Sequence, residues 1–179
     1  GAILLTDDGD LAYRLTHPSY GVDKAYRVGV SEAPSPPVIS KLKSGVIIDG
    51  RKTSKARVRV LGSGREGTEM EIVIHEGRNR QIRKMCDVVG CPVVWLERFA
   101  FAGINVNDLA RGAWRHLTGE EVGALRELVQ LGVVLLRALG CPTHQDALVP
   151  GHRCNHPSSA FLRLGAFARF VLGHVVYYY

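Results

Sequence analysis

The densest chemistry in the sequence lies in residues 76–85, which read EGRNRQIRKM. This stretch carries four cations and two side-chain amides: Arg78, Arg80, Arg83, Lys84, Asn79 and Gln81. Guanidinium groups beside exposed backbone N–H groups at the start of a helix are suited to binding phosphate. Cations at that place oppose the helix dipole, so their presence there indicates a bound anion. A solvent-exposed basic helix face is the alternative that the spacing leaves open.

The hydrophobic periodicity on either side predicts the elements that position this stretch. Residues 69–75 (EMEIVIH) alternate apolar and polar side chains, which is the period of a half-buried strand. Residues 81–89 carry apolar side chains at helical spacing: Ile82, Met85, Val88 and Val89. The sequence therefore predicts a strand, a glycine turn and a helix, with the cations on the turn and the first helical turn.

The rest of the sequence up to residue 132 reads as short strands with few helices between them. Further strands are predicted over residues 2–5, 24–30, 46–48, 55–61, 93–99 and 101–106. Helices are predicted over residues 10–15, 38–43 and from 119 onward, with a linker at 34–37, a turn at 49–50 and a flexible loop at 62–67. Hairpin-like pairs of strands favour an α+β fold with a mixed, mostly antiparallel sheet flanked by helices over a parallel doubly wound sheet.

Composition limits the class of protein. The 179 residues carry a net charge of +6, which points to a polyanionic partner. The four cysteines have no paired C-x-x-C spacing and no segment resembles a secretory signal, so a cytoplasmic protein with reduced thiols is expected. No apolar run approaches the length of about 18 residues that a membrane span requires, so we expect no membrane association.

Several segments in a fixed order resemble one enzyme family. Residues 4–28 (LLTDDGDLAYRLTHPSYGVDKAYRV) are similar to LLTNDGELANRLxHPxYxVxKxYxV, and residues 76–85 to EGRNRQ-hydrophobic-R-R-M. Residues 42–46 (LKSGV) and 109–122 (LARGAWRHLTGEEV) are similar to L-x-x-G-V and L-x-x-G-x-W-R-x-L-T-x-E-E-V. On these motifs the chain resembles the ribosomal RNA pseudouridine synthases of the RsuA/RluB branch, whose catalytic domain is built on a curled mixed sheet.

The resemblance implies an isomerase that converts uridine to pseudouridine in ribosomal RNA without a cofactor. The enzyme breaks the N1–C1′ bond, turns the base and rejoins it through C5, after the base has left its stack. It further implies that Tyr26 lines the base pocket, that Ile82 packs beside Tyr26, and that Arg83 faces a nucleophilic aspartate. RNA-binding roles fall to Lys24, Arg78, Asn79, Arg80, Gln81 and Lys84. The expected partner is ribosomal RNA, bound by a monomer.

The sequence departs from the family pattern at the nucleophile. The family aspartate lies in G-R-L-D-x-x-T/S-x-G-L-L, and residues 1–5 (GAILL) match only the end of that motif. The aspartate is therefore expected about five residues before Gly1, and a chain without it is expected to be inactive alone. A non-catalytic RNA-binding module is the alternative. Asp7, Asp8 and Asp10 have the wrong offset for the nucleophile and are interpreted as turn and helix-cap residues rather than metal ligands.

The end of the chain differs in composition from the rest. We predict a partial catalytic domain over residues 1–132 and an atypical extension over 133–179 that is poorly ordered or out of frame. Acidic residues nearly vanish in the extension, and Val133 to Leu139 is expected to continue the preceding helix. A zinc site is the less favoured alternative, because its cysteines and histidines match no regular spacing: Cys141, His144, His152, Cys154 and His156.

Overall fold

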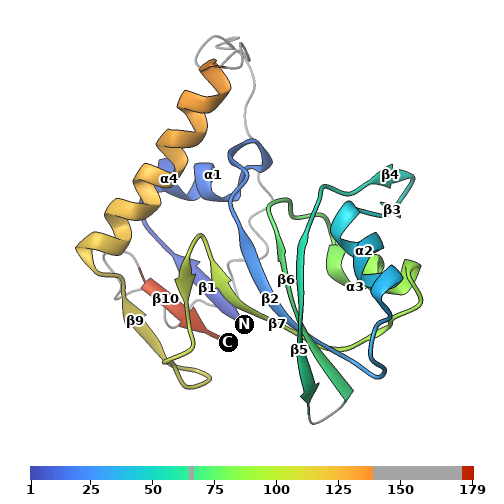
Figure 1. The fold of residues 1–179 in the computed structure, drawn as a ribbon. Coiled ribbons are helices and arrows are strands. Elements are labelled where there is room, and N and C mark those ends of the chain that lie inside the picture. The colour runs from blue at the N-terminus through green and yellow to red at the C-terminus, as the bar shows by residue number, and fades with distance from the viewer. Residues whose placement is uncertain (65–66, 139–174) are drawn as a thin grey trace.

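The alternating strand that leads into the basic stretch lies inside a five-stranded antiparallel sheet (Figure 1). The computed structural model describes residues 1–64, 67–138 and 175–179. The order in this sheet is β5 (Arg57–Gly64), β6 (Gly67–Ile74), β2 (Lys24–Val30), β7 (Val93–Phe101) and β8 (Ile104–Asn105). All strand pairs that the structure describes are antiparallel, so the predicted α+β fold with a mostly antiparallel sheet is confirmed.

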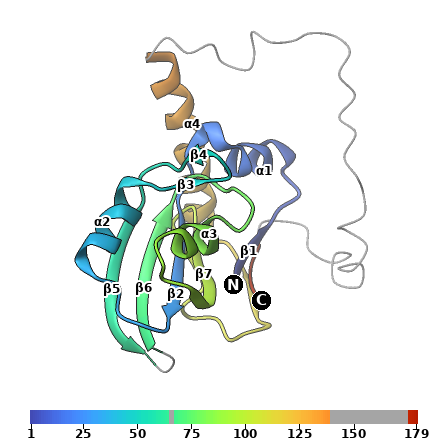
Figure 2. The ribbon, with the colours of Figure 1, turned by 90° about the vertical axis from the view of Figure 1, so that its right-hand side faces the viewer.

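Two helices cover one face of the five-stranded sheet, α2 (Pro36–Ser44) and α3 (Gln81–Val88) (Figure 2). Alternate residues of β2 and β6 point toward them, because successive side chains of a strand face opposite sides. The resulting core joins strand residues such as Val28 and Ile72 to Leu42 of α2 and Met85 of α3, and each of these four side chains is fully buried. This core fixes α3 against the sheet, directly after the basic stretch.

A second sheet stands beside the first and packs against the other two helices. Its strands, in order, are β1 (Ala2–Leu5), β10 (Val175–Tyr178) and β9 (Trp114–His116). A second core joins this sheet to α1 (Gly9–Thr16) and α4 (Gly119–Ala138), with Leu11, Leu125 and Val176 at its centre. None of the described helices is long and apolar enough to cross a membrane.

The last residues of the chain take a place that the sequence analysis did not anticipate. β10 lies between β1 and β9, with Val176 opposite both Leu4 and Arg115 (Figure 1). Helix α4 runs through the predicted boundary at residue 132 as far as Ala138, so the helix continues as expected. Residues 139–174, which carry the zinc alternative and most of the predicted extension, lie outside the described residues. The division into two domains stays a prediction.

Three local predictions were wrong. The flexible loop predicted at 62–67 is a hairpin instead: β5 continues to Gly64 and β6 begins at Gly67, with a register shift between Val60 and Gly62. The strand predicted at 101–106 is interrupted, because residues 102 and 103 turn the chain with φ of 54° and 83°. The helix predicted from residue 38 begins at Pro36, since proline is well accommodated in the first helical turn.

Candidate RNA-binding and active site

The basic stretch forms a bend between β6 and α3 whose inner side is organised by Glu76. The Glu76 carboxylate accepts hydrogen bonds from the Ser54 backbone N–H (2.9 Å) and the Gln81 side-chain amide (2.6 Å). It also forms an ion pair with Arg78 at 3.5 Å, and its side chain is 16% exposed. A half-buried carboxylate with this many donors is held in one position, so Glu76 sets the shape of the bend.

Gln81 and Arg78 complete this inner network. Gln81 is 3% exposed, and its Oε1 accepts the Arg78 backbone N–H at 3.0 Å while its Nε2 donates to Glu76. The Arg78 guanidinium donates to the carbonyl oxygens of Arg51 (3.0 Å) and Lys52 (2.7 Å). Both side chains, predicted to bind RNA, are therefore engaged inside the protein, with Gln81 out of reach of solvent.

Asn79 and Arg80 lie on the outer side of the same bend. Both are exposed, and in the described part of the chain their side chains have no hydrogen-bond or ion-pair partner. Arg80 precedes α3 with a φ of 51°, a left-handed conformation that costs a non-glycine residue about 1–2 kcal/mol. The strained residue of this turn is thus Arg80 rather than the predicted glycine, Gly77, which has no positive φ. Strain of this kind is concentrated at functional sites.

A small hairpin, β3 (Ile47–Ile48) and β4 (Arg51–Lys52), lies next to the bend. Its predicted turn is confirmed: Asp49 and Gly50 have φ of 51° and 73°, as a two-residue hairpin loop requires. Lys84 of α3 donates to Asp49 at 2.6 Å. Lys84, predicted to bind RNA, therefore also ties α3 to the hairpin, as Arg78 does from the bend.

Tyr26 and Ile82 meet at one core. Tyr26 is half-buried and packs against the cluster that contains Ile82, on the face of the sheet that α3 covers. The register places Tyr26 opposite Ile72 of β6 and Arg98 of β7. The structure thus brings together the two residues that the sequence analysis assigned to the base pocket.

Two cations share one aromatic ring beside Tyr26. Lys24 Nζ lies 5.6 Å from the centre of the Phe101 ring, and the Arg98 guanidinium carbon lies 5.4 Å from it. Burial, followed by repulsion from Arg98, lowers the pKa of Lys24. Among the described residues neither cation has a carboxylate partner in an ion pair. An anion placed here would relieve the repulsion and favour the charged lysine.

The first residues of the chain pack against this corner. Arg98 Nε donates to the carbonyl oxygen of Ala2 at 2.8 Å. A Cβ atom on Gly1 would lie 2.8 Å from the backbone nitrogen of Arg98, so only glycine fits at that position. The bend is close as well, since a Cβ atom on Gly77 would lie 3.6 Å from Lys24 Cε. Strand β1, the bend and the Lys24 end of the central strand β2 therefore lie close together at one end of the sheet.

Arg83 does not lie at the same end of β2 as Tyr26, the other predicted catalytic residue. Its Nη1 donates to the carbonyl oxygen of Val93 at 3.4 Å. Val93 pairs with Val30, at the opposite end of β2 from Lys24. In the described part of the chain no hydrogen bond joins Arg83 to Tyr26, and the cation in register with Tyr26 is Arg98.

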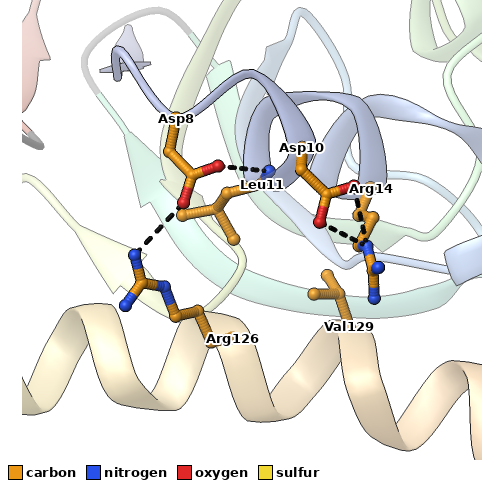
Figure 3. Close-up of a pocket in the computed structure, with 6 residues that line it drawn as sticks. All are labelled: Asp8, Asp10, Leu11, Arg14, Arg126 and Val129. Atoms are coloured by element: carbon orange, nitrogen blue, oxygen red, sulfur yellow. Dashed lines mark hydrogen bonds and ion pairs between the residues drawn. The ribbon is translucent and has the colours of Figure 1, made fainter.

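Two hollows in the described part of the chain contain neither Tyr26 nor Arg83. The larger, of about 200 Å³, lies between α1 and α4 (Figure 3). Its acidic side chains are engaged: Asp8 accepts the Leu11 backbone N–H at 3.0 Å and pairs with Arg126, and Asp10 pairs with Arg14. The predicted helix-cap role of Asp8 is confirmed. The second hollow, of about 170 Å³, includes Arg27, Phe99 and Tyr178.

The sequence analysis missed Glu76 and Arg98. Glu76 is the one acidic residue in a stretch with four cations, and an ion pair within that stretch could have been expected from the sequence. Arg98 has no comparable local signal, because its importance comes from strand pairing between β2 and β7.

Comparisons with known proteins support the resemblance. A family model described as RNA pseudouridylate synthase matches residues 1–87. Ribosomal large subunit pseudouridine synthase B of Bacillus subtilis is 37% identical over 134 residues, which cover 74% of this chain and 55% of the relative. The protein of the same name from Vibrio vulnificus is 38% identical over 133 residues, covering 73% of this chain and 41% of the relative.

A comparison with solved structures gives a match of the same kind. It is described as a pseudouridylate synthase, has 27% sequence identity and a TM-score of 0.62, and is matched over 67% of this chain and 52% of its own. The chain spans about half the length, or less, of the curated relatives it matches. Residues 1–87 thus match the RNA pseudouridylate synthase family, and the longer stretch shared with these relatives is similar to RNA pseudouridine synthases.

Proposed function

We propose that this chain forms the part of a ribosomal RNA pseudouridine synthase that holds the RNA and the target uridine. One observation supports this most strongly: Tyr26, in register with Arg98 and packed on the core of Ile82, lies near the end of the central strand β2 from which the basic bend starts. A ribosomal RNA substrate would place the protein in the cytoplasm. The monomeric state and the absence of a cofactor remain part of the proposal.

The proposed role of Tyr26 is to receive the extruded base. A flipped nucleotide needs an aromatic or apolar platform, and unstacking it costs a few kcal/mol. The half-buried phenol ring of Tyr26 offers that platform, with Ile82 behind it in the same cluster. Asn79 and Arg80, exposed on the bend, are the groups best placed to hold phosphates beside the extruded nucleotide.

The chemistry requires an anionic nucleophile next to this platform. The resemblance puts an aspartate before Gly1, and Gly1 packs directly on Arg98. The cation pair formed by Lys24 and Arg98 would keep such an aspartate ionised, because nearby positive charge lowers the pKa of a carboxyl group. In this proposal the carboxylate displaces N1 from C1′, the base turns on Tyr26, and C5 bonds to C1′ as the carboxylate leaves. N1 gains a proton, and C5 loses its proton next to the Tyr26 hydroxyl.

Two arginines are candidates for the partner of that aspartate. Arg83 is the residue that the resemblance assigns, and its 3.4 Å hydrogen bond to Val93 is too long to fix the guanidinium where it now lies. Arg98 is favoured by position, since it is held by Ala2 and stands opposite Tyr26. A mutation at each position separates the two assignments.

The test measures tritium release from ribosomal RNA labelled at C5 of uridine. The chain extended upstream by a segment carrying Gly-Arg-Leu-Asp is expected to release tritium, and the 179-residue chain alone is expected not to. In the extended chain, Tyr26→Phe should lower the rate by about 100-fold or more. Release by the unextended chain would refute the need for the aspartate.

The arginine variants assign the cation in the same assay. If Arg83→Ala loses activity and Arg98→Ala keeps it, Arg83 is the partner of the aspartate, as the resemblance implies. If Arg98→Ala loses activity and Arg83→Ala keeps it, Arg98 is the partner, as its position opposite Tyr26 favours. RNA binding by the extended chain without any tritium release would leave only the alternative, a non-catalytic RNA-binding module.

A further inference from the structure

The β3–β4 hairpin is held more firmly than its size explains. Paired strands of two residues are marginal on their own. Here the hairpin is closed at its base by Thr53, whose N–H donates to the Val46 carbonyl (2.8 Å) and whose Oγ1 accepts the Val46 N–H (3.0 Å). Arg78 holds the carbonyls of β4, and Lys84 holds the turn at Asp49. The hairpin is therefore a rigid extension of the bend.

The outer face of this hairpin combines an apolar side chain with cations. Ile47 pairs directly with Lys52, so their side chains share one face, while Ile48 on the other face is 3% exposed in the core. Ile47 is 64% exposed. Lys52 is exposed on the face of Ile47. Arg51 pairs with Ile48, but its side chain is exposed next to the turn, and in the described part of the chain only the backbone carbonyls of Arg51 and Lys52 are engaged.

The charge of the hairpin and bend is strongly positive. Residues 47–55 and 76–84 contain seven cations and two acids, Asp49 and Glu76. Both acids are already paired, with Lys84 and Arg78 respectively. The exposed cations Arg51, Lys52 and Arg80 therefore face solvent without compensation, which favours a polyanion on this surface.

We propose that the outer face of the β3–β4 hairpin is a second RNA-contact surface, continuous with the exposed side of the bend. Lys52 on this face and the exposed Arg51, which pairs with Ile48 next to the turn, bind phosphates that flank the target uridine, and Ile47 packs against an adjacent base. This proposal rests on the proposed function and extends it to a surface outside the pocket. An exposed apolar side chain between cations matches a ligand that alternates flat bases with phosphates, whereas an acidic peptide would use the cations alone.

The test measures the affinity of the 179-residue chain for a fluorescein-labelled stem–loop RNA with uridines in its loop, over a range of salt concentrations. Removal of two phosphate contacts in the double variant Arg51→Ala, Lys52→Ala should weaken binding about tenfold and lower the salt slope by about 1.4. Ile47→Ser should weaken binding about fivefold with an unchanged salt slope, since it removes an apolar contact.

The matched control is the double variant Arg57→Ala, Arg59→Ala. These arginines are also exposed, at 75% and 71%, but lie on the opposite face of the sheet from α3, because Val58 between them is buried in the core. The control should retain nearly all of the affinity. Equal losses in control and hairpin variants would overturn the hairpin surface while leaving RNA binding intact.

Two further outcomes separate the possible failures. If the unmodified chain does not bind the RNA, the proposed function fails together with this inference. If polyglutamate of matched charge competes as well as unlabelled RNA and Ile47→Ser has no effect, the surface is a general anion site and the base contact is refuted.

Discussion

Helices α3 and α4 begin in opposite ways. At the start of α4, the Thr118 N–H donates to Glu121 at 2.9 Å and the Glu121 N–H donates to Thr118 Oγ1 at 3.2 Å, which is a reciprocal capping box. Arg115 then holds the same carboxylate with two bonds of 2.7 Å. The first turn is acidic, as the helix dipole favours.

The start of α3 has none of these features. Arg80 caps it in a left-handed conformation without a side-chain hydrogen bond, and its first turn has no acidic residue. The bend before α3 is held instead by the hydrogen bonds and the ion pair among Glu76, Arg78 and Gln81. Cations and backbone strain at this helix start, on an otherwise well-bonded bend, are what the proposed binding of an anion would explain.

The largest effect expected from breaking this arrangement is that of Glu76→Ala. The substitution leaves the Ser54 N–H and the Gln81 amide without their acceptor and Arg78 without its ion pair. We expect the free energy of unfolding to fall by about 2–3 kcal/mol, measured by chemical denaturation. Glu71→Ala on β6, the strand that leads into the bend, loses only a pair with the exposed Arg59 and should cost less than about 1 kcal/mol. Equal losses would contradict the special role of Glu76.

A smaller effect is expected for Arg78→Lys, which keeps the charge and loses the forked geometry. Lysine cannot donate to the carbonyls of Arg51 and Lys52 at the same angles, so the β3–β4 hairpin should loosen. Hydrogen exchange at Thr53, whose N–H bonds to Val46, should become about tenfold faster. Unchanged exchange at Thr53 would show that Arg78 does not hold the hairpin.

The smallest effect concerns the start of α4 and depends on pH. Hydrogen bonds from Arg115 and then from the Thr118 N–H lower the pKa of Glu121 from 4.5 to about 2. A carboxyl group with a lowered folded-state pKa adds stability above its unfolded pKa and loses it as the pH falls. The advantage of the native protein over Glu121→Gln should therefore be full above pH 4.5 and disappear between pH 4.5 and about 2.

This advantage should be below about 1 kcal/mol, because the pair is partly exposed to solvent. Urea denaturation of both proteins at several pH values measures it. A difference that does not change with pH would contradict the role of the ionised carboxylate.

Much of the scaffold around the site was predictable because its signals are local. The alternation in β2 gave its bounds, Lys24–Val30, and the change of period from strand to helix located the bend before α3. Strands β9 and β10 were not predicted. They are short, and β10 pairs both with β9 and, across nearly the whole chain, with β1, which no local pattern records.

The division of the bend into inner and outer residues was not predictable either. Periodicity tells which face of a strand or helix is buried, but a turn has no period. Arg78 and Gln81 therefore looked like Asn79 and Arg80 in the sequence, although their side chains are engaged inside the protein. Arg98 escaped notice because its relation to Tyr26 depends on the register between β2 and β7.

Arg80→Gly tests most directly whether the start of α3 is arranged for RNA rather than for stability. Glycine adopts a φ of 51° without strain, so the free energy of unfolding should rise by about 0.5–1 kcal/mol. Loss of the exposed cation should at the same time weaken binding of the labelled stem–loop RNA and lower its salt slope by about 0.7. A variant that is less stable than the native protein, or that binds RNA equally well, would contradict the account.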